Sequence, residues 1–529
     1  MKNRFKTILL CVAVTISTAS LSQCHIDLTT AQSTIEIGSY TSITAYGAAN
    51  YLWTPNIGLN VNSGGTVMAS PNQTTTYTVT GTCAWTKVAG GALHSIGIKT
   101  DGTLWTWGGN EHGQLGIGAG GAFAMPQQVG TDNNWLSIAS GNHHCLALKS
   151  NGTLWAWGDN AFGQLGDGTT LDQVYPVQVG DQDDWLEVAA GAEHSLAIKL
   201  DGTLWSWGNN MDGQLGDMTN ASHPVPAQVG SANDWLSISS NGFHCLAIRT
   251  NQTIWSWGNN VHGQLGDGSN LSRNSPVQVG TANNWSKVTC GYYFSMAIQD
   301  NGSLWGWGNN AGHQLGNGMD TNLSQPQQVG NSLEWKDVSG GLFHSVGIKN
   351  DHSLWAWGLN NGGSVGNCTN ASVDIPVHIA SNGTWQSAVA CRDFSLGITF
   401  NGSVAGWGVN NTGQLGNGTL DPQNCPVIIE SIVSATITIT VIPVGVENLN
   451  AADLIKVFPN PAIDFFTVKL EASLLGTSYS LVDLTGSTIT SGIFRNEITT
   501  IDTQALSPGI YLLLSGEQNL PAVKILKTQ

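Results

Sequence analysis

The stretch Gly191-Ala-Glu-His-Ser-Leu-Ala-Ile-Lys-Leu-Asp-Gly-Thr-Leu-Trp-Ser-Trp-Gly208 recurs with small changes every 50 residues along this chain. Its short alternating apolar runs are typical of β-strands, and the Asp201-Gly202 pair between two runs is a strong hairpin signal. Trp205 and Trp207 stand two residues apart and share one strand face, where we expect them to pack against a neighbouring unit. Each unit therefore predicts about four short strands and leaves no room for a helix.

The repeat runs through most of the chain and explains its unusual composition, with 66 glycines and 21 tryptophans in 529 residues. Trp-Gly pairs begin at Trp107, Trp157, Trp207, Trp257, Trp307, Trp357 and Trp407. Seven four-stranded units arranged around an axis form a β-propeller. A linear solenoid is the alternative, but it needs atypical polar units at both ends, and the terminal units here resemble the middle ones. The sequence predicts an all-β protein with a seven-bladed propeller over residues 84–442.

The two ends of the repeat region predict how the ring closes. The first unit starts at Trp85 without a preceding Pro-x-x-Val strand, whereas the last unit carries an additional one at Pro426-Val-Ile-Ile429. We expect this C-terminal strand to complete the first blade. Deletion of Pro426 to Glu430 would then lower the thermal stability sharply.

The N-terminus has the pattern of a secretory signal peptide over residues 1–23. Lys2, Arg4 and Lys6 precede an apolar run from Ile8 to Ile16, which is too short to span a membrane. No other stretch is apolar enough to cross a bilayer. The net charge of −17 leaves no basic patch for phosphates and argues against nucleic acid as a partner.

Residues 24–83 contain short alternating runs such as Thr34 to Ile37 and Ser42 to Ala45, and they resemble the immunoglobulin-like modules of bacterial surface proteins. The resemblance implies a small β-sandwich. A core of about 60 residues is thin, so a disulfide between Cys24 and Cys83 would help to stabilise it. Cys145 and Cys245 share one repeat position and are expected to be small buried fillers. The sequence leaves open whether the remaining cysteines pair, namely Cys290, Cys368, Cys391 and Cys425.

The repeat unit resembles the regulator of chromosome condensation repeat family. The shared pattern is Gly-x-x-His-Ser-x-Ala-Ile-Lys-x-Asp-Gly-x-Leu-Trp-x-Trp-Gly-x-Asn-x-x-Gly-Gln-Leu-Gly, and the similarity covers about Ala84 to Val441. It implies a seven-bladed propeller. The known members differ in activity: they include a nucleotide-exchange factor for a small GTPase and a plant ultraviolet-B receptor, so the fold alone does not define a function. This chain is acidic and exported, unlike the exchange factor, and it lacks the Gly-Trp-Arg-His-Thr motifs of the photoreceptor.

The C-terminal segment, residues 455–529, follows a linker at 443–454 and resembles the sorting domain of type IX secretion substrates. The matching residues are Phe458, Pro459, Asn460, Pro461, Asp464, Gly509, Tyr511 and Lys524. This resemblance implies a second β-sandwich, recognition by the type IX machinery, and location outside or on the outer surface of a Gram-negative bacterium.

No catalytic, cofactor or metal site is expected. Histidine recurs at one repeat position, from His94 to His344, and Phe294 and Phe394 replace it twice, which favours a packed residue over a catalytic one. The single Gly-x-Ser-x-Gly match, around Ser364, is a variant of the Gly-Gln-Leu-Gly repeat and not the strand-to-helix elbow of a hydrolase.

Candidate binding residues lie where the units differ from one another. One set is the dipeptide before Gly-Gln-Leu-Gly, and the other is a singular pair in unit five and in unit seven. We expect them on one rim: Glu111, His112, Phe162, Met211, His262, Tyr292, Tyr293, Arg392 and Asp393. The predicted function is a non-catalytic scaffold that binds an extracellular protein or glycan. The alternatives are an extracellular polysaccharide hydrolase or lyase, which would need paired acids in the central channel, and a purely structural or adhesive surface component.

Overall fold

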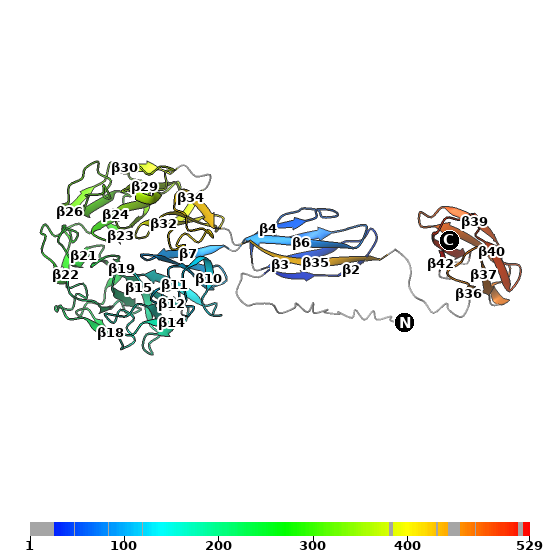
Figure 1. Cartoon of the computed structure of the whole chain (residues 1–529), viewed down its shortest axis with the longest axis horizontal. Coiled ribbons are helices and arrows are strands. Elements are labelled where there is room, and N and C mark those ends of the chain that lie inside the picture. The colour runs from blue at the N-terminus through cyan, green and yellow to red at the C-terminus, as the bar shows by residue number, and fades with distance from the viewer. Residues whose placement is uncertain are drawn as a thin grey trace, which may run out of the picture.

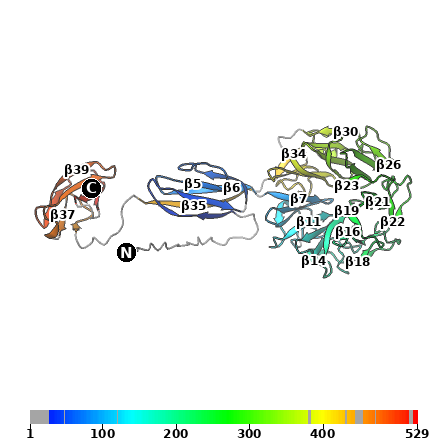
Figure 2. The ribbon, with the colours of Figure 1, turned by 180° about the vertical axis from the view of Figure 1, so that it is seen from behind.

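The computed structural model of this 529-residue chain describes residues 26–46, 48–82, 84–118, 120–379, 384–429, 432–442, 455–470, 472–516 and 522–528. The predicted signal peptide, the predicted linker at 443–454, Cys24 and Cys83 lie outside these residues. The described chain forms a β-propeller, a two-sheet module beside it and a C-terminal module, seen in one row from both sides (Figures 1 and 2). No helix of the described residues has the length and apolar character needed to cross a bilayer.

Seven four-stranded antiparallel sheets form the blades, numbered 1 to 7 in chain order, within the described part of the chain. The first strands contact one another around the axis, and they are β7 (Trp85–Gly90), β11 (Trp135–Ser140), β15 (Trp185–Ala190), β19 (Trp235–Ser240), β23 (Trp285–Cys290), β27 (Trp335–Gly340) and β31 (Trp385–Ala390). The second strands are β8 (His94–Lys99), β12 (His144–Lys149), β16 (His194–Lys199), β20 (His244–Arg249), β24 (Phe294–Gln299), β28 (His344–Lys349) and β32 (Phe394–Thr399).

The third and fourth strands complete each blade toward the outside of the ring (Figure 1). The third strands are β9 (Leu104–Gly108), β13 (Leu154–Gly158), β17 (Leu204–Gly208), β21 (Ile254–Gly258), β25 (Leu304–Gly308), β29 (Leu354–Gly358) and β33 (Val404–Gly408). The fourth are β10 (Phe123–Gln128), β14 (Gln173–Gln178), β18 (His223–Gln228), β22 (Arg273–Gln278), β26 (Leu323–Gln328), β30 (Val373–His378) and β34 (Gln423–Ile429), with a short 3-10 turn, η1 (Asn361–Gly363), in blade 6. The predicted all-β blades are confirmed.

The recurring tryptophans occupy the contact between blades. In blade 3 the rings of Trp185 and Trp205 meet edge to face with centroids 6.0 Å apart, and Lys199 lies over both rings. Trp207 is fully buried in a cluster with Leu146, Leu154 and Leu165 of blade 2. Burial of a whole indole against the next blade stabilises each contact by the area removed from water, which is the packing that the sequence predicts.

The ring closes through hydrogen bonds that also join blades 2 and 3, not through a shared strand. The backbone carbonyl of Gln414 in blade 7 accepts hydrogen bonds from Trp107 Nε1, at 2.8 Å, and Ser95 Oγ, at 2.7 Å, both in blade 1. Between blades 2 and 3 the carbonyl of Gln164 makes the equivalent contacts with Trp207 and Ser195.

The expectation that Pro426 to Ile429 completes the first blade is therefore wrong. These residues belong to β34, which pairs with β33 in blade 7, while blade 1 is completed by its own strand β10. Each unit supplies all four of its strands in chain order. Every blade has its Pro-containing strand last. The first unit therefore needs no such strand before Trp85, and the strand that contains Pro426 is not additional.

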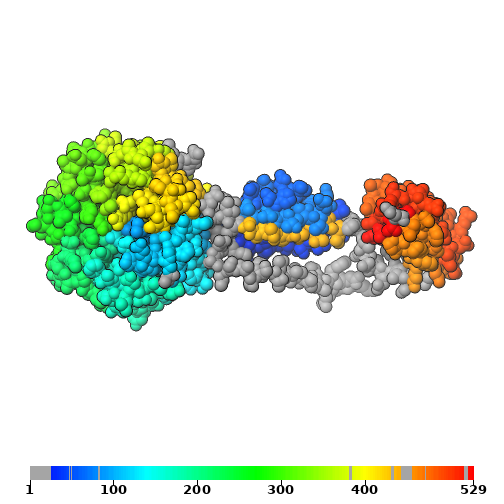
Figure 3. Space-filling model, in the orientation of Figure 1, coloured from blue at the N-terminus to red at the C-terminus, as the bar shows by residue number. Residues whose placement is uncertain are grey.

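Strand β35 (Ile432–Ile442) follows blade 7 and pairs with the N-terminal strands outside the ring. It lies antiparallel to β6 (Thr75–Thr82), with Ile432 opposite Thr82 and Ile439 opposite Thr75, and parallel to β2 (Thr34–Glu36). Figure 3 shows β35 as a band between strands of the N-terminal segment. The strand pairing thus places β35 with the N-terminal strands, although the sequence predicted residues up to 442 in the propeller.

Two sheets form this clasp module, defined as residues 26–82 together with β35. One sheet has the order β1 (Asp27–Thr30), β3 (Thr41–Tyr46), β5 (Thr66–Ala69), and the other has the order β2, β35, β6, β4 (Ala49–Thr54). Their shared core includes Trp53, Tyr77 and Ile439, each fully buried. A small core gains its central strand from beyond the propeller, which explains how so short an N-terminal segment buries a tryptophan completely.

One disulfide joins the last two blades: Cys368, after the third strand of blade 6, is bonded to Cys425 in β34 of blade 7, with Cα atoms 4.5 Å apart. Cys145, Cys245, Cys290 and Cys391 are buried free thiols. Burial raises the pKa of the Cys145 thiol to about 12, so it stays protonated, as a small packed side chain does.

The C-terminal module has two sheets, β36 (Ile455–Phe458), β37 (Phe465–Leu470), β40 (Ile498–Asp502), and β39 (Thr488–Ile493), β38 (Ser478–Asp483), β41 (Gly509–Ser515), β42 (Val523–Lys527), plus a short 3-10 turn, η2 (Ala472–Leu474). Its core contains Phe466, Leu481 and Ile525. The module is a separate β-structure with its own core.

Candidate binding face

One face of the propeller is formed by two loops of each blade. The first loop is the hairpin between the first and second strands, and the second follows the third strand. At five of the seven junctions of the described blades, backbone hydrogen bonds join consecutive hairpins around the axis, among them Asn142 N–H to Ala192 O at 3.2 Å and Tyr292 N–H to Gly341 O at 2.9 Å. A rigid ring of backbone therefore positions the side chains of this face.

The second loop of each blade reaches the hairpin of the next blade. His112 lies beside His143 with ring centroids 5.1 Å apart, and His262 lies beside Tyr293 at 5.4 Å. At the junction that closes the ring, Thr412 Oγ1 donates a hydrogen bond to the carbonyl of Leu93 at 2.9 Å. The structure thus brings the predicted dipeptides and the predicted singular pairs onto one face, which we call the loop face.

Tyr292 reaches across the central opening of the ring on the loop face, which we call the mouth. Its hydroxyl accepts a hydrogen bond from Asn142 Nδ2 at 3.2 Å, although Tyr292 belongs to blade 5 and Asn142 to blade 2. Blades 2 and 5 are not neighbours, so this contact crosses the axis. Its ring packs edge to face on Tyr293 at 4.8 Å and on Phe243 of blade 4 at 5.7 Å. Together with His262 these rings form an aromatic cluster at the mouth.

Arg392 supplies positive charge to the same region. Its guanidinium lies 3.4 Å from Asp393, and both side chains are partly exposed. Burial raises the pKa of Tyr293, and the neighbouring Tyr292 raises it further, while Arg392 opposes both. Burial also lowers the pKa of His143, and His112 and Arg392 add to that lowering. The guanidinium therefore acts electrostatically on side chains of blades 2 and 5.

Glu111, Phe162 and Met211 each lie in the loop after the third strand of their own blade, and no hydrogen bond, ion pair or ring contact among the described residues joins them to this cluster. Met211 of blade 3 is 69 % exposed. Glu111 is exposed and Phe162 half-buried, each in the loop of its own blade. Sequence comparison of the units missed Asn142 and Phe243, although both occupy hairpin positions where the seven units differ.

The recurring histidines are framework residues. His144 Nε2 lies 3.0 Å from Ser195 Oγ of the next blade, and that hydroxyl donates its own proton to the carbonyl of Gln164. Nε2 must therefore carry the proton of a neutral imidazole. Burial lowers the pKa of His144 to about 3, so this position joins blades and performs no proton transfer near neutral pH.

Four charged side chains occupy the third positions of the first strands. Lys287 of blade 5 forms an ion pair with Asp337 of blade 6. Burial raises the pKa of Glu187 to about 7, opposed by a hydrogen bond from the Ile238 amide and by the charge of Lys87. Lys87 and Glu187 come from blades 1 and 3 and influence each other, so these side chains face the axis. Sequence reasoning did not single them out.

The sorting residues of the C-terminal module lie at its last strand. Asn460 Nδ2 donates to the carbonyl of Lys524 at 2.7 Å, and its Oδ1 accepts the Leu526 amide at 2.8 Å, so the loop between β36 and β37 is held on β42. Tyr511 pairs with Ile525 across β41 and β42. Thr503 N–H donates to the carbonyl of Asp464. Phe458 is 49 % exposed beside Pro459 and Pro461, and Gly509 lies opposite Lys527.

Comparison with protein families identifies the class. Residues 171–447 match the RCC1-like domain, residues 101–148 and residues 85–114 and 135–164 match the regulator of chromosome condensation (RCC1) repeat, and residues 456–526 match the secretion system C-terminal sorting domain. The first match spans more than half of the chain, which therefore belongs to the RCC1-like domain family. The last match shows a substrate of type IX secretion, so the protein is secreted or placed on the outer surface of a Gram-negative bacterium.

Solved structures share the propeller. Prp20p from Saccharomyces cerevisiae has 21 % sequence identity and a TM-score of 0.58, covering 63 % of this chain and 87 % of that chain. Human WBSCR16 has 21 % identity and a TM-score of 0.55, covering 60 % and 87 %. At this identity the likeness shows the fold alone. A search of the curated proteins finds no match to this chain.

Proposed function

We propose that this protein is a secreted, non-catalytic binding module whose loop face captures an extracellular glycan at the mouth of the propeller ring. The observation that carries the proposal is Tyr292, which extends from blade 5 to Asn142 of blade 2 and packs on Tyr293 and Phe243. No other hairpin of the described blades brings three aromatic rings together. Binding residues of repeat scaffolds lie where one unit departs from its neighbours on a rigid frame.

The chemistry of the cluster favours a sugar. Aromatic faces cover apolar C–H surfaces, while tyrosine hydroxyls, the Asn142 amide and the Arg392 guanidinium supply the few polar groups that orient a small ligand. Tyr292 and Tyr293 are half-buried and not protruding, which suits a short oligosaccharide better than a protein interface of about 800 Å² per partner. A protein ligand is the alternative, and the test below distinguishes it from a glycan.

The acids near the axis support binding without catalysis. Glycoside hydrolysis uses two carboxyl groups that flank one bond. Here Asp337 is engaged by Lys287, and Glu187 is influenced by Lys87. Asp337 thus has a lysine as its ion-pair partner, and Glu187 accepts a hydrogen bond from the Ile238 amide, which supports a structural role for both carboxylates.

A glycan array and a surface pull-down with the secreted protein test the proposal. We expect saturable binding of a glycan set, lost in a variant that combines Tyr292→Ser, Tyr293→Ser and Arg392→Ser, and kept in Met211→Ala, an exposed control on the same face. Unchanged binding by the triple variant would overturn the assignment of the face. Glycan turnover would establish an enzyme instead, and capture of a protein partner without glycan binding would replace the glycan with a protein.

A further inference from the structure

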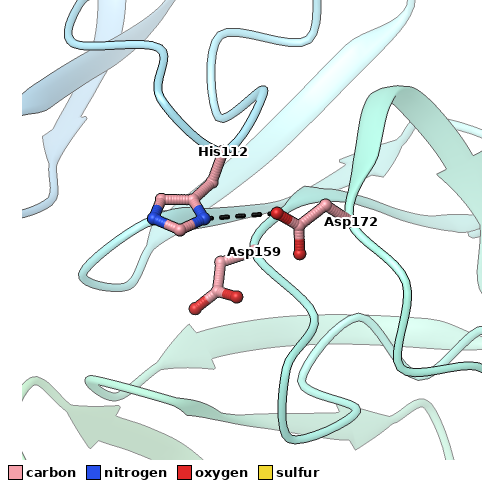
Figure 4. A group of neighbouring side chains, drawn as sticks. All are labelled: His112, Asp159 and Asp172. Carbon is pink, nitrogen blue, oxygen red and sulfur yellow. Dashed lines mark hydrogen bonds and ion pairs between the residues drawn. The ribbon is translucent and has the colours of Figure 1, made fainter.

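A second group of side chains lies on the loop face between blades 1 and 2. His112 comes from the loop after the third strand of blade 1, and Asp159 and Asp172 come from the corresponding loop of blade 2. Each offers one ligand atom, and these atoms lie within 4.8 Å of one another. Figure 4 shows the imidazole of His112 facing Asp172 with Asp159 below it; His112 Nδ1 is 3.2 Å from Asp172 Oδ2.

The two acids stand at framework positions that are neutral in every other blade. Asp159 accepts the Ala161 amide and the Gln164 side-chain amide, and Asn209 makes the same two contacts in blade 3. A neutral amide therefore makes the same loop contacts, so they do not require a charge at this position. Blade 2 alone carries an acid here, among Gly109, Asp159, Asn209, Asn259, Asn309, Leu359 and Val409.

Asp172 repeats this pattern. It accepts the Asn160 amide at 2.9 Å, as Ser222 accepts the Asn210 amide in blade 3 and Asn322 accepts the Asn310 amide in blade 5. The corresponding residues are Ala122, Asp172, Ser222, Ser272, Asn322, Ser372 and Pro422, so this acid is also singular. Blade 2 thus carries both of these singular aspartates, opposite a histidine of blade 1.

The charge of the two carboxylates is not balanced by a protein cation. Among the described residues neither Asp159 nor Asp172 forms an ion pair with a lysine or arginine, and the imidazole is their ionisable partner. Each carboxylate oxygen has two lone pairs. The hydrogen bonds from the loop backbone and from Gln164 occupy at most one lone pair on each oxygen of Asp159 and Asp172. The side chains of His112 and Asp172 are 40 % and 41 % exposed, so the group is open to solutes.

The geometry points to a binding site for a divalent transition-metal ion, with zinc as the best fit, held by His112, Asp159 and Asp172. One imidazole and two carboxylates suit zinc at ligand distances of about 2.0–2.2 Å, with water in the remaining position. Tetrahedral ligand atoms then lie about 3.4 Å apart, so small side-chain rotations from the present arrangement complete the site. The ion would join blade 1 to blade 2.

The chain contains its own control at the junction between blades 4 and 5. His262 occupies the position of His112, and its Nδ1 lies 3.3 Å from Asn322 Nδ2, the counterpart of the contact with Asp172. Asn309 takes the place of Asp159. The backbone frame and the histidine are the same, while amides replace both carboxylates, so this junction should not bind zinc.

Zinc titration by calorimetry on the full chain, with Co²⁺ absorption as a second probe, tests the site. We expect one saturable event and a rise in melting temperature with zinc, because an ion that binds the folded state stabilises it. Asp172→Ser and Asp159→Asn reproduce blade 3 and keep the framework acceptors. Each should weaken zinc binding by about ten-fold or more, whereas His262→Ala should leave it unchanged.

Binding should also weaken on acidification, because a protonated imidazole cannot serve as a ligand. The proposal is overturned if the wild-type chain shows no saturable zinc binding, if both aspartate variants bind as the wild type does, or if His262→Ala weakens binding as much as Asp172→Ser. Glycan binding is measured separately. A failure of the glycan proposal would concern the site at Tyr292 and would not change the result of the zinc titration.

Discussion

The side-chain amide of Asn142 donates a hydrogen bond to the hydroxyl of Tyr292 across the mouth of the ring, from blade 2 to blade 5. The contact holds the tyrosine ring in place over the axis. Tyr292→Phe removes the hydroxyl and keeps the ring, so we expect weaker ligand binding with a change in unfolding free energy of about 1 kcal/mol or less. Ligand titration and thermal denaturation of the variant check this; a large loss of stability with unchanged affinity would assign Tyr292 to structure instead.

The buried histidines should make the propeller sensitive to acid. The pKa of His194 is lowered from its ordinary 6.5 to about 3 by burial. The unfolded chain therefore binds more protons between these values, and stability falls as the pH drops from 6.5 toward 3. His194→Phe, the residue found in blade 5, removes a cost of about 2 kcal/mol at pH 5.

Denaturant unfolding at pH 7.5 and pH 5 measures this difference. The variant should lose less stability on acidification than the wild type. Equal pH dependence in both proteins would show that His194 does not carry the effect.

Glu187 should act in the opposite direction. Its pKa is raised to about 7 by burial, so the folded state binds the additional proton between about 4.5 and 7. Stability is lost as the pH rises through this window, and the loss is complete above it. Glu187→Gln keeps an acceptor for the Ile238 amide and should melt higher than the wild type at pH 8.5, with no difference at pH 4. A gain that is equal at both pH values would exclude titration as its cause.

The disulfide between Cys368 and Cys425 should stabilise the junction of blades 6 and 7. The two cysteines are 57 residues apart, and the chain-entropy argument assigns about 4 kcal/mol to a loop of that length. Blade 4 carries a serine, Ser275, at the position of Cys425, so Cys425→Ser is a conservative test. We expect a lower melting temperature in this variant and little change in Cys290→Ser as the unbridged control.

The clasp module should unfold separately from the ring. Ile439 of β35 is fully buried in the core with Trp53 and Tyr77. Ile439→Ala should cost the clasp about 2–5 kcal/mol while the blades, which contain 20 of the 21 tryptophans, keep their near-ultraviolet dichroism. Limited proteolysis should then cut the N-terminal strands first. A single unfolding transition that shifts as a whole would show that ring and clasp unfold together.

The blades could be predicted from sequence because each unit repeats the same local signals, an Asp-Gly or Asn-Gly turn and a Trp-x-Trp-Gly strand. The partner of β35 could not be predicted in this way. Its alternation of threonine and isoleucine from Ser434 to Val441 fits any half-buried strand, and its partner Thr82 is distant in sequence. The starting point of a repeat is also arbitrary in sequence, which led to the wrong prediction that β34 completes blade 1.

The candidate site was predictable to the same degree. Comparison of the units identified Tyr292, Tyr293 and Arg392 as singular residues. It could not show that Tyr292 meets Asn142, because that contact depends on the curvature of the closed ring. The approach of His112 to Asp172 likewise depends on how loops of adjacent blades meet.

Strands β6 and β35 are neighbours in one sheet, so topologically they are the two arms of a hairpin whose turn is residues 83–431, the whole propeller. Paired strands lie about 4.8 Å apart, and the pairing of Thr82 with Ile432 holds the entry and the exit of the ring at that separation. During synthesis the clasp module cannot be completed until the ring has emerged, so a truncated chain lacks β35. The same arrangement makes the ring an exchangeable insert: any module whose ends meet one strand spacing apart could be mounted in its place.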